Sequence, residues 1–164
     1  MRLIKGTMLT CTFEDGNQAP LRHAVVDALV LKDNQLLLVK RTKKLLEGGK
    51  WGLVGGYVDR DENLQQAVAR EVEEETGYLV SNITLLTIRD NPDRPKEDRQ
   101  NISFVFFCHA GDKVSESDWE VDDQQWFDFD DLPPETKIAF DHFKNIQLYK
   151  QYTVEKFPLP VLGD

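Results

Sequence analysis

A helical pattern of apolar positions lies near the middle of the chain. Four apolar residues recur at intervals of three, one and four positions, which places them on one face of an α-helix. Asp61 or Asn63 can cap the start of this helix, and Gly77 suits the left-handed position after a last turn. The pattern therefore predicts an amphipathic helix that ends at Gly77. The residues of its buried face are Leu64, Ala67, Val68 and Val72.

Apolar runs predict strands on both sides of this helix. Residues 23–31 and 35–41 are β-prone and flank Asp33-Asn34, which is the arrangement of a β-hairpin. Residues 51–54 are typical of a short strand that leads into a glycine pair, and residues 8–13 of a hairpin or edge strand outside the main core. Further predicted strands cover 79–89 and 102–109.

The C-terminal part of the chain predicts one more helix. Apolar residues at helical spacing indicate a helix at 136–149, and the tail at 151–164, with two prolines, is expected to be extended. Strands alternating with two helices indicate an α/β chain with a mixed sheet between helical layers. No repeat or linker divides the 164 residues, so we expect one domain, 1–164.

Several glutamates occupy core-facing positions of the central helix. At about 100° per residue, Glu71 and Glu75 fall within the apolar face and Glu74 falls at its edge. Only Glu73 points squarely away. Inward carboxylates repel one another and are costly to desolvate unless a cation neutralises them. Their direction favours a Mg²⁺-type oxygen site over the alternative, an ordinary charged helix laced by salt bridges.

The stretch from Gly55 to Tyr78 resembles the Nudix box, G-x5-E-x7-R-E-U-x-E-E-x-G-U, where U is bulky and apolar. Tyr78 stands where an aliphatic residue is usual, Val54 replaces a frequent proline, and Asp59 replaces a frequent glutamate. None of these departures removes a metal ligand of the family. Eight matched positions over 23 residues make the resemblance specific. The matching residues are Gly56, Glu62, Arg70, Glu71, Val72, Glu74, Glu75 and Gly77.

The resemblance implies a fold and a cofactor. The fold is the Nudix fold, an α/β/α sandwich with a mixed β-sheet, in which the box at 56–78 is a strand-loop-helix and the core covers about 22–150. Trp126 to Pro133 resembles the segment that closes this fold, with Asp131 in place of a glutamate. The cofactor is Mg²⁺ or Mn²⁺. The implied metal ligands are the backbone carbonyl of Gly55 and the carboxylates of Glu71, Glu74 and Glu75.

The resemblance also implies roles around the metal. Arg70 orients the glutamates through hydrogen bonds, and Glu62 is a structural or supporting carboxylate. In related enzymes the general base is a box glutamate or an acid on a later loop. Here the candidate for that acid is Glu120, with Glu116 second; the alternative for both is a solvated acidic loop.

Charge and composition narrow the partners. The chain has 29 acidic and 20 basic residues, a net charge of −9 and a pI near 4.8, which argues against nucleic acid or an anionic membrane as the main partner. A phosphorylated small molecule stays compatible because bound cations invert the local field. No apolar run approaches the roughly 20 residues of a membrane span. Cys11 and Cys108 lie far apart; a disulfide between them is the alternative to the favoured interpretation, two buried free thiols in a reducing cytosol. We therefore expect a cytoplasmic protein.

Candidate substrate contacts come from weaker signals. Residues 89–95 resemble the proline- and arginine-containing loop that follows the box in ADP-ribose pyrophosphatases, where Arg94 or Arg99 would contact a ribose or phosphate. Each candidate also has a plain structural explanation, as a solvated turn, a strand end or a core residue. The three histidines, His23, His109 and His142, are predicted to be structural. The candidate phosphate contacts are Lys40 and Arg41, and the candidate base-stacking residues are Trp51, Tyr57 and Phe129.

The favoured function is divalent-metal-dependent pyrophosphohydrolysis of a nucleoside diphosphate linked to another moiety, with ADP-ribose as the favoured substrate. The close alternative is an oxidised nucleoside triphosphate such as 8-oxo-dGTP. A non-catalytic nucleotide sensor is less favoured because the box acids are intact and no basic DNA-binding segment is left over. A prenyl diphosphate isomerase would need a catalytic cysteine in its own motif, which neither Cys11 nor Cys108 provides. The resemblance also suggests a homodimer.

Overall fold

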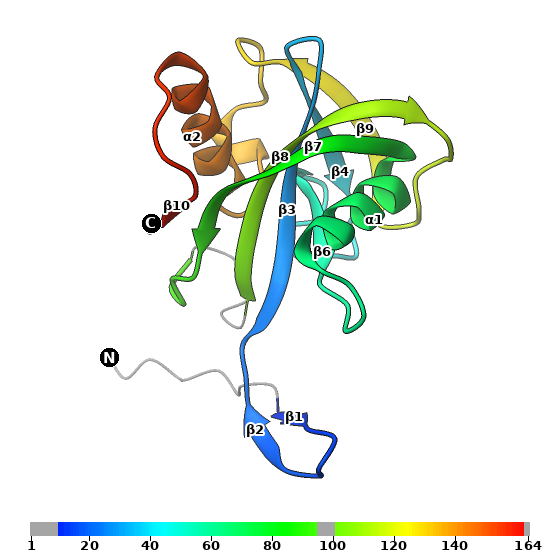
Figure 1. Ribbon diagram of the computed structural model, residues 1–164. Coiled ribbons are helices and arrows are strands. Elements are labelled where there is room, and N and C mark those ends of the chain that lie inside the picture. The colour runs from blue at the N-terminus through cyan, green and yellow to red at the C-terminus, as the bar shows by residue number, and fades with distance from the viewer. Residues whose placement is uncertain (1–9, 95–100, 163–164) are drawn as a thin grey trace.

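A mixed β-sheet forms the centre of the molecule. The computed structural model describes residues 10–94 and 101–162. In this part of the chain the main sheet has eight strands in the order β10-β7-β8-β3-β4-β5, with β6 paired to β3 and β9 paired to β4 (Figure 1). These strands are β3 (His23–Lys32), β4 (Gln35–Arg41), β5 (Trp51–Gly52), β6 (Val54–Tyr57), β7 (Tyr78–Arg89), β8 (Asn101–Lys113), β9 (Val121–Asp128) and β10 (Val161–Leu162).

Two helices cover opposite faces of this sheet. On β3, Val26 and Ala28 point to one face and pack in a core with Val68 of helix α1 (Leu64–Thr76). Leu29, from the alternate positions of β3, points to the other face and packs with Ile146 of helix α2 (His142–Val154). The period of two along a strand therefore separates the two cores. The predicted layered α/β/α arrangement is confirmed.

The β3–β4 hairpin forms as its sequence predicts. Asp33 and Asn34 both have positive φ angles, 48° and 64°, as a tight two-residue hairpin turn requires. Val30 then pairs with Leu37, and Leu31 with Leu36. β3 also pairs in parallel with β8, which places this hairpin in the middle of the sheet.

Helix α1 has the ends that its sequence predicts. Of the two candidate caps, Asn63 is the one used: its side chain accepts from the backbone N–H of Gln66 in a capping box. Gly77 follows the last turn with φ 79°, and its N–H donates to the Glu73 carbonyl at 2.8 Å. The box helix is thus fixed at both ends before any tertiary contact is counted.

Gly77→Ala is expected to destabilise the fold by at least about 1–2 kcal/mol, the cost of a left-handed L-residue. A Cβ there would also meet the Ser115 carbonyl oxygen at 1.8 Å, so the measured loss should exceed the conformational cost alone. Urea denaturation measures this loss. Gly49→Ala is the matched control, because Gly49 has φ 81° with nothing within 4 Å of a Cβ. Equal losses in both variants would contradict the steric contribution at Gly77.

The predicted helix at 136–149 is wrong in its first part. A short 3₁₀ turn (Glu135–Lys137) comes first, and α2 begins only at His142. Ala139 donates its N–H to the Trp51 carbonyl at 2.7 Å, and Phe140 has φ 53°. Pairing with the β5 edge therefore outcompetes the helix at these positions. The tail differs from the expected extended segment only at its start, where α2 continues to Val154. Its end is extended as expected, and β10 pairs in parallel with β7.

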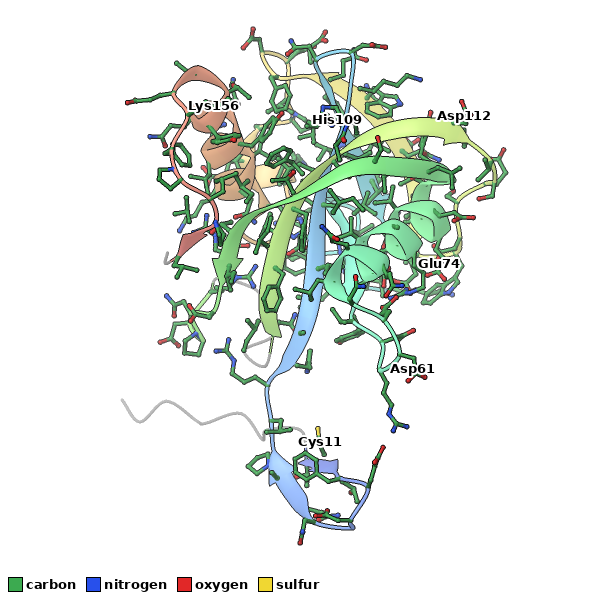
Figure 2. The ribbon with its side chains drawn as sticks, viewed as in Figure 1. Cys11, Asp61, Glu74, His109, Asp112 and Lys156 are labelled. Atoms are coloured by element: carbon green, nitrogen blue, oxygen red, sulfur yellow. The ribbon has the colours of Figure 1, made fainter. Side chains whose placement is uncertain are left out.

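The N-terminal hairpin stands apart from the main sheet. Strands β1 (Thr10–Thr12) and β2 (Gln18–Pro20) pair only with each other in the described chain, as Figure 1 shows. This confirms a hairpin outside the main core for residues 10–13; residues 8 and 9 of that prediction lie outside the described residues. Both cysteines are free, but only Cys108 is buried, so the expectation of a buried Cys11 is wrong (Figure 2). None of the described helices is long and apolar enough to cross a membrane.

Candidate active site

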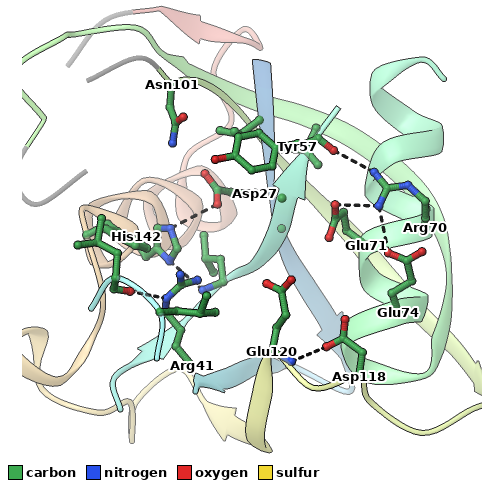
Figure 3. A pocket seen from close by; sticks show the side chains of 18 of the residues that line it. Asp27, Arg41, Tyr57, Arg70, Glu71, Glu74, Asn101, Asp118, Glu120 and His142 are labelled. Atoms are coloured by element: carbon green, nitrogen blue, oxygen red, sulfur yellow. Dashed lines mark hydrogen bonds and ion pairs between the residues drawn. The ribbon is translucent and has the colours of Figure 1, made fainter. Parts of the chain in front are cut away.

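A cavity of about 560 Å³ opens between α1, the middle of the sheet and the start of α2 (Figure 3). Its walls come from segments that are far apart in the sequence, including β3, β6, and the loops before β5 and β9. The box contributes residues from both its glycine pair and its helix. These are Gly55, Gly56, Tyr57, Asp59, Arg70, Glu71 and Glu74.

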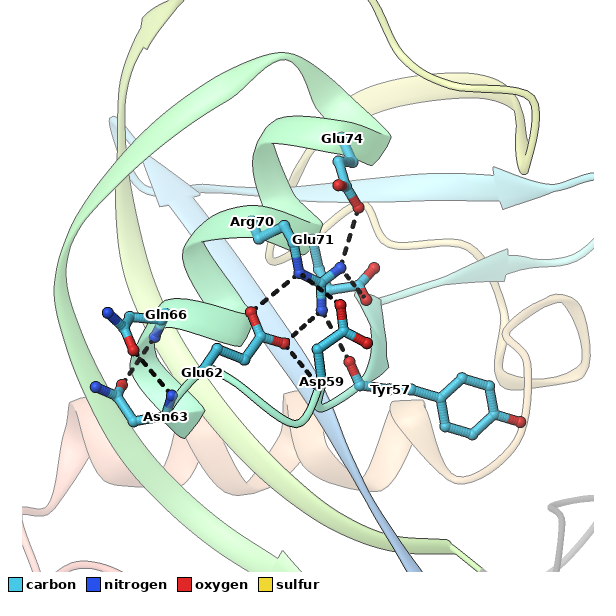
Figure 4. Close-up of polar contacts among 8 residues, drawn as sticks. All are labelled: Tyr57, Asp59, Glu62, Asn63, Gln66, Arg70, Glu71 and Glu74. Atoms are coloured by element: carbon cyan, nitrogen blue, oxygen red, sulfur yellow. Dashed lines mark hydrogen bonds and ion pairs between the residues drawn. The ribbon is translucent and has the colours of Figure 1, made fainter.

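Arg70 is the centre of the polar contacts along the box (Figure 4). It donates to both oxygens of Glu62, at 3.0 and 2.6 Å, and to the Tyr57 carbonyl at 2.9 Å. It also donates to Glu71 at 2.8 Å and to Glu74 at 3.0 Å, the i+4 pair that the spacing predicts. The hydrogen bonds that Arg70 donates to Glu62, and then to Glu71 and Glu74, raise the pKa of Arg70. One guanidinium thus ties the loop before α1 to the helix carboxylates.

The box glutamates point as the helical wheel predicts. The Glu75 residue is 5% exposed and the Glu71 side chain 13%, whereas half of the Glu74 side chain is exposed. Burial raises the pKa of Glu71 against the opposing effect of Arg70, and the charges of Glu74 and Glu120 raise it further. Burial, followed by the charge of Glu71, raises the pKa of Glu75 well above its ordinary value. Inward carboxylates therefore carry the desolvation and repulsion that a bound cation would relieve.

The glycine pair lets the β6 backbone pack closely against its neighbours. A Cβ on Gly55 would lie 2.0 Å from the Val26 carbonyl oxygen, inside the sheet. A Cβ on Gly56 would lie 2.4 Å from Glu71 Oε1. Gly55 also donates its N–H to Glu75 Oε2 at 3.3 Å. Side chains at either glycine would displace the carboxylates or the strand.

The carboxylates are close to Arg70 rather than grouped around an empty centre. Among the described residues, no three His, Cys, Asp or Glu side chains already converge in an arrangement that would hold a metal ion. Arg70 engages one oxygen each of Glu71 and Glu74. Arg70 therefore leaves the second oxygen of each of these carboxylates available to a cation.

Glu120 reaches the same cavity from the loop before β9. Its backbone is held by a hydrogen bond from Thr42 N–H to the Glu120 carbonyl and by Glu120 N–H donating to Asp118, both at 2.9 Å. Figure 3 shows its carboxylate directed into the cavity, and its charge acts on the pKa of Glu71. Glu116, the second candidate, is exposed and pairs with Lys113 outside the cavity.

Of the seven predicted substrate contacts, Arg41 and Tyr57 line this cavity, four residues lie elsewhere, and one lies outside the described residues. Arg41 donates to the Leu46 carbonyl at 3.0 Å and lies over the Phe140 ring. Lys40 lies over the Trp51 ring, which packs edge-on against Phe127.

The remaining two residues are held by contacts of their own. Phe129 packs near Tyr149 and borders a separate cavity of about 380 Å³. Arg94 is buried and makes two 2.7 Å hydrogen bonds to Asp141. The side chains of Lys40, Trp51, Phe129 and Arg94 are therefore held by packing or ion pairing. Arg99 lies outside the described residues.

Several cavity residues were missed by the sequence analysis. They include Asp27, Asn101, Phe140 and His142. His142 is structurally satisfied, as predicted: its Nδ1 accepts from Leu53 N–H at 2.9 Å, and its Nε2 lies 3.3 Å from Asp27 Oδ1. The sequence holds one signal that could have indicated Asp27: it is the single charged residue in the apolar run 23–31.

Comparisons with known proteins agree with the fold and the box. The family model described as the NUDIX domain matches residues 21–149. An ADP-ribose pyrophosphatase of Methanocaldococcus jannaschii is 35% identical over 128 residues, which is 77% of this chain and 72% of that protein. The chain therefore belongs to the Nudix hydrolase family.

Solved structures show the same likeness. A MutT NUDIX hydrolase of Burkholderia pseudomallei is 30% identical with a TM-score of 0.66, over 77% of this chain and 96% of that one. The NUDIX domain of Shewanella oneidensis NrtR, complexed with ADP ribose, is 26% identical with a TM-score of 0.68, over 86% and 93%. Seven further curated relatives are longer proteins, of which the chain spans 29–40%.

Proposed function

We propose that this protein is a divalent-metal-dependent pyrophosphohydrolase that cleaves ADP-ribose or a similar nucleoside diphosphate joined to a sugar. The observation that carries the proposal is the meeting of Glu71 and Glu74 with Glu120 around one cavity of substrate size. The archaeal relative named as an ADP-ribose pyrophosphatase supports the substrate class. The ADP-ribose complex of the Shewanella domain supports it as well.

The residues of the box fit a hard divalent cation. The donors that would hold Mg²⁺ or Mn²⁺ are the carboxylates of Glu71, Glu74 and Glu75 and the carbonyl of Gly55. Glu75 is buried and the neighbouring Glu71 is nearly buried, and burial raises the pKa of both carboxylates. Oxygen donors of this kind suit either cation. When bound, the cation would neutralise phosphate charge and make a water nucleophilic near neutral pH.

The chain's own residues would prepare the cleavage. Arg70 would hold the box carboxylates in place, since it contacts Glu62, Glu71 and Glu74. Glu120, directed into the cavity, would accept a proton from the attacking water. Arg41 would balance negative charge on the diphosphate. Tyr57, exposed at the cavity mouth, would offer its ring to the group attached to the diphosphate. Trp51 and Phe129, the other ring candidates, pack in the interior.

A substrate panel tests this proposal. Phosphoanhydride cleavage would be followed with Mg²⁺ and with Mn²⁺ on ADP-ribose, other sugar nucleotides, diadenosine polyphosphates, 8-oxo-dGTP and ordinary dNTPs, and the products identified by chromatography. We expect ADP-ribose to have the highest kcat/KM and to give AMP. Preference for a triphosphate with release of pyrophosphate would overturn the substrate class, and tight binding of a nucleotide without turnover would favour the sensor.

A cytoplasmic location is part of the same proposal. Two free cysteines suit the reducing cytoplasm. The homodimer suggested by the resemblance stays a prediction, because the structure is that of a single chain.

A further inference from the structure

We infer that Asp27 is a specificity-determining residue: it accepts hydrogen bonds from the hydroxyl groups of a neutral sugar on the substrate and disfavours an additional phosphate at that end. The inference rests on the proposed function and deepens it, because it separates sugar-linked diphosphates from triphosphates.

Asp27 lies in the cavity wall away from the box carboxylates. It belongs to β3, where its position alternates with Val26 and Ala28, so its side chain points to the face covered by α2. The side chain is 12% exposed, and this exposure opens to the cavity. Figure 3 shows Asp27 beside His142 and Tyr57, across the cavity from Arg70 and Glu74.

Two side chains hold the Asp27 carboxylate in place. The Ser103 hydroxyl donates to Oδ2, and His142 Nε2 lies 3.3 Å from Oδ1. Because His142 Nδ1 accepts from Leu53 N–H, the proton of the neutral ring is on Nε2 and is donated to Asp27. His142 therefore has no nitrogen left to act on a substrate, and it serves as a positioning residue for Asp27.

The groups around this carboxylate favour its ionised form. Burial alone would raise the pKa of Asp27, but His142, the Ser103 hydroxyl and the charge of Arg94 together outweigh it and lower the pKa. An ionised carboxylate is an acceptor only, with about four lone-pair positions. Ser103 and His142 take two of them, which leaves acceptor capacity towards the cavity.

Because the Asp27 carboxylate only accepts hydrogen bonds, it determines which group of a substrate can bind beside it in the cavity. With the diphosphate near Glu71 and Glu74, a group attached to it that fills the rest of the cavity would face Asp27. Sugar hydroxyls can donate to a carboxylate in charge-assisted hydrogen bonds. A third phosphate carries no donor when ionised and would be repelled by a charge of the same sign.

The test is a change of ligand preference in Asp27→Asn. The dissociation constants of ADP-ribose and ATP would be measured by calorimetry in EDTA, for the wild type and the variant. We expect the constant for ADP-ribose to rise about 10-fold or more, the loss of a hydrogen bond to a charged group. The constant for ATP should stay unchanged or fall. Equal weakening of both ligands, or no change for ADP-ribose, would overturn the inference.

Two further variants control for folding. Ser103→Ala keeps the carboxylate but removes one group that holds it, and should shift the preference in the same direction by a smaller factor. Asp130→Asn makes the same substitution at a fully exposed position that borders the separate cavity and should leave both constants unchanged. A preference shift of equal size in Asp130→Asn would overturn the inference.

Turnover of ADP-ribose with Mg²⁺, measured on the same samples, separates this inference from the proposed function. Wild-type protein that binds ADP-ribose without cleaving it would sink the proposed hydrolysis, while the ratio of dissociation constants would still decide the role of Asp27. Wild-type protein that neither binds ADP-ribose nor cleaves it with Mg²⁺ would overturn both.

Discussion

Glu74→Gln is expected to lower kcat on the preferred substrate by about 10²–10³-fold, the scale of losing one charged group that stabilises a transition state. The fold should be unaffected. Half of the Glu74 side chain is exposed, and its ion pair with Arg70 lies at the surface of the helix. Exposed pairs of this kind contribute about 0–1 kcal/mol. The measurements are steady-state kinetics with saturating Mg²⁺ and thermal unfolding of the same preparation.

Glu73→Gln is the matched control for this variant. Glu73 is the neighbouring residue on the same helix, it is exposed, and it does not line the cavity. The same change of charge there should leave kcat within about twofold, since uninvolved surface substitutions have small effects. Full activity in Glu74→Gln with an intact fold would show that the assignment of Glu74 is wrong.

The box could be predicted because its signals are local. The cap at Asn63 involves Gln66, and the left-handed Gly77 donates to Glu73, so each helix end depends on residues within about one turn. The inward direction of Glu75 follows from the apolar spacing of the same helix. The prediction of a helix from residue 136 is wrong because the cause of the observed structure there is not local. Ile138 and Ala139 have helical spacing, but Trp51, almost 90 residues earlier, pairs with this segment instead. Local periodicity cannot reveal a competing partner so far away.

The rest of the cavity depends on strand register. Lys40 and Arg41 are equivalent candidates in the sequence, yet only Arg41 lines the cavity. The pairing of β4 with β9 shifts between these two residues, and such an irregularity re-aims the side chains around it. Asp27 and His142 meet only because β3 and α2 pack together. The sequence alone could therefore name candidate residues, but strand register and packing decide which of them line the cavity.

Arg70→Ala is expected to destabilise the protein by about 2 kcal/mol or more, below the 3–5 kcal/mol of a fully buried ion pair because Arg70 is partly exposed. Its removal leaves the nearby carboxylates of Glu62 and Glu71 without their shared cation. At about 2–4 °C per kcal/mol for a chain of this size, the thermal midpoint should fall by about 4–8 °C. Activity should fall about 10–100-fold, as when a residue that orients metal ligands is lost.

Two other variants show whether the losses in Arg70→Ala come from the contacts of its guanidinium. Arg60→Ala removes an arginine whose only ion pair in the described residues, with Glu14, is between exposed side chains, so the midpoint and the activity should both be unchanged. Arg70→Lys keeps the charge but loses the guanidinium that reaches Glu62, Glu71 and the Tyr57 carbonyl at once. It should recover most of the stability and little of the activity. Full recovery of activity by lysine would mean that charge alone, rather than the orientation of the carboxylates, is what Arg70 contributes.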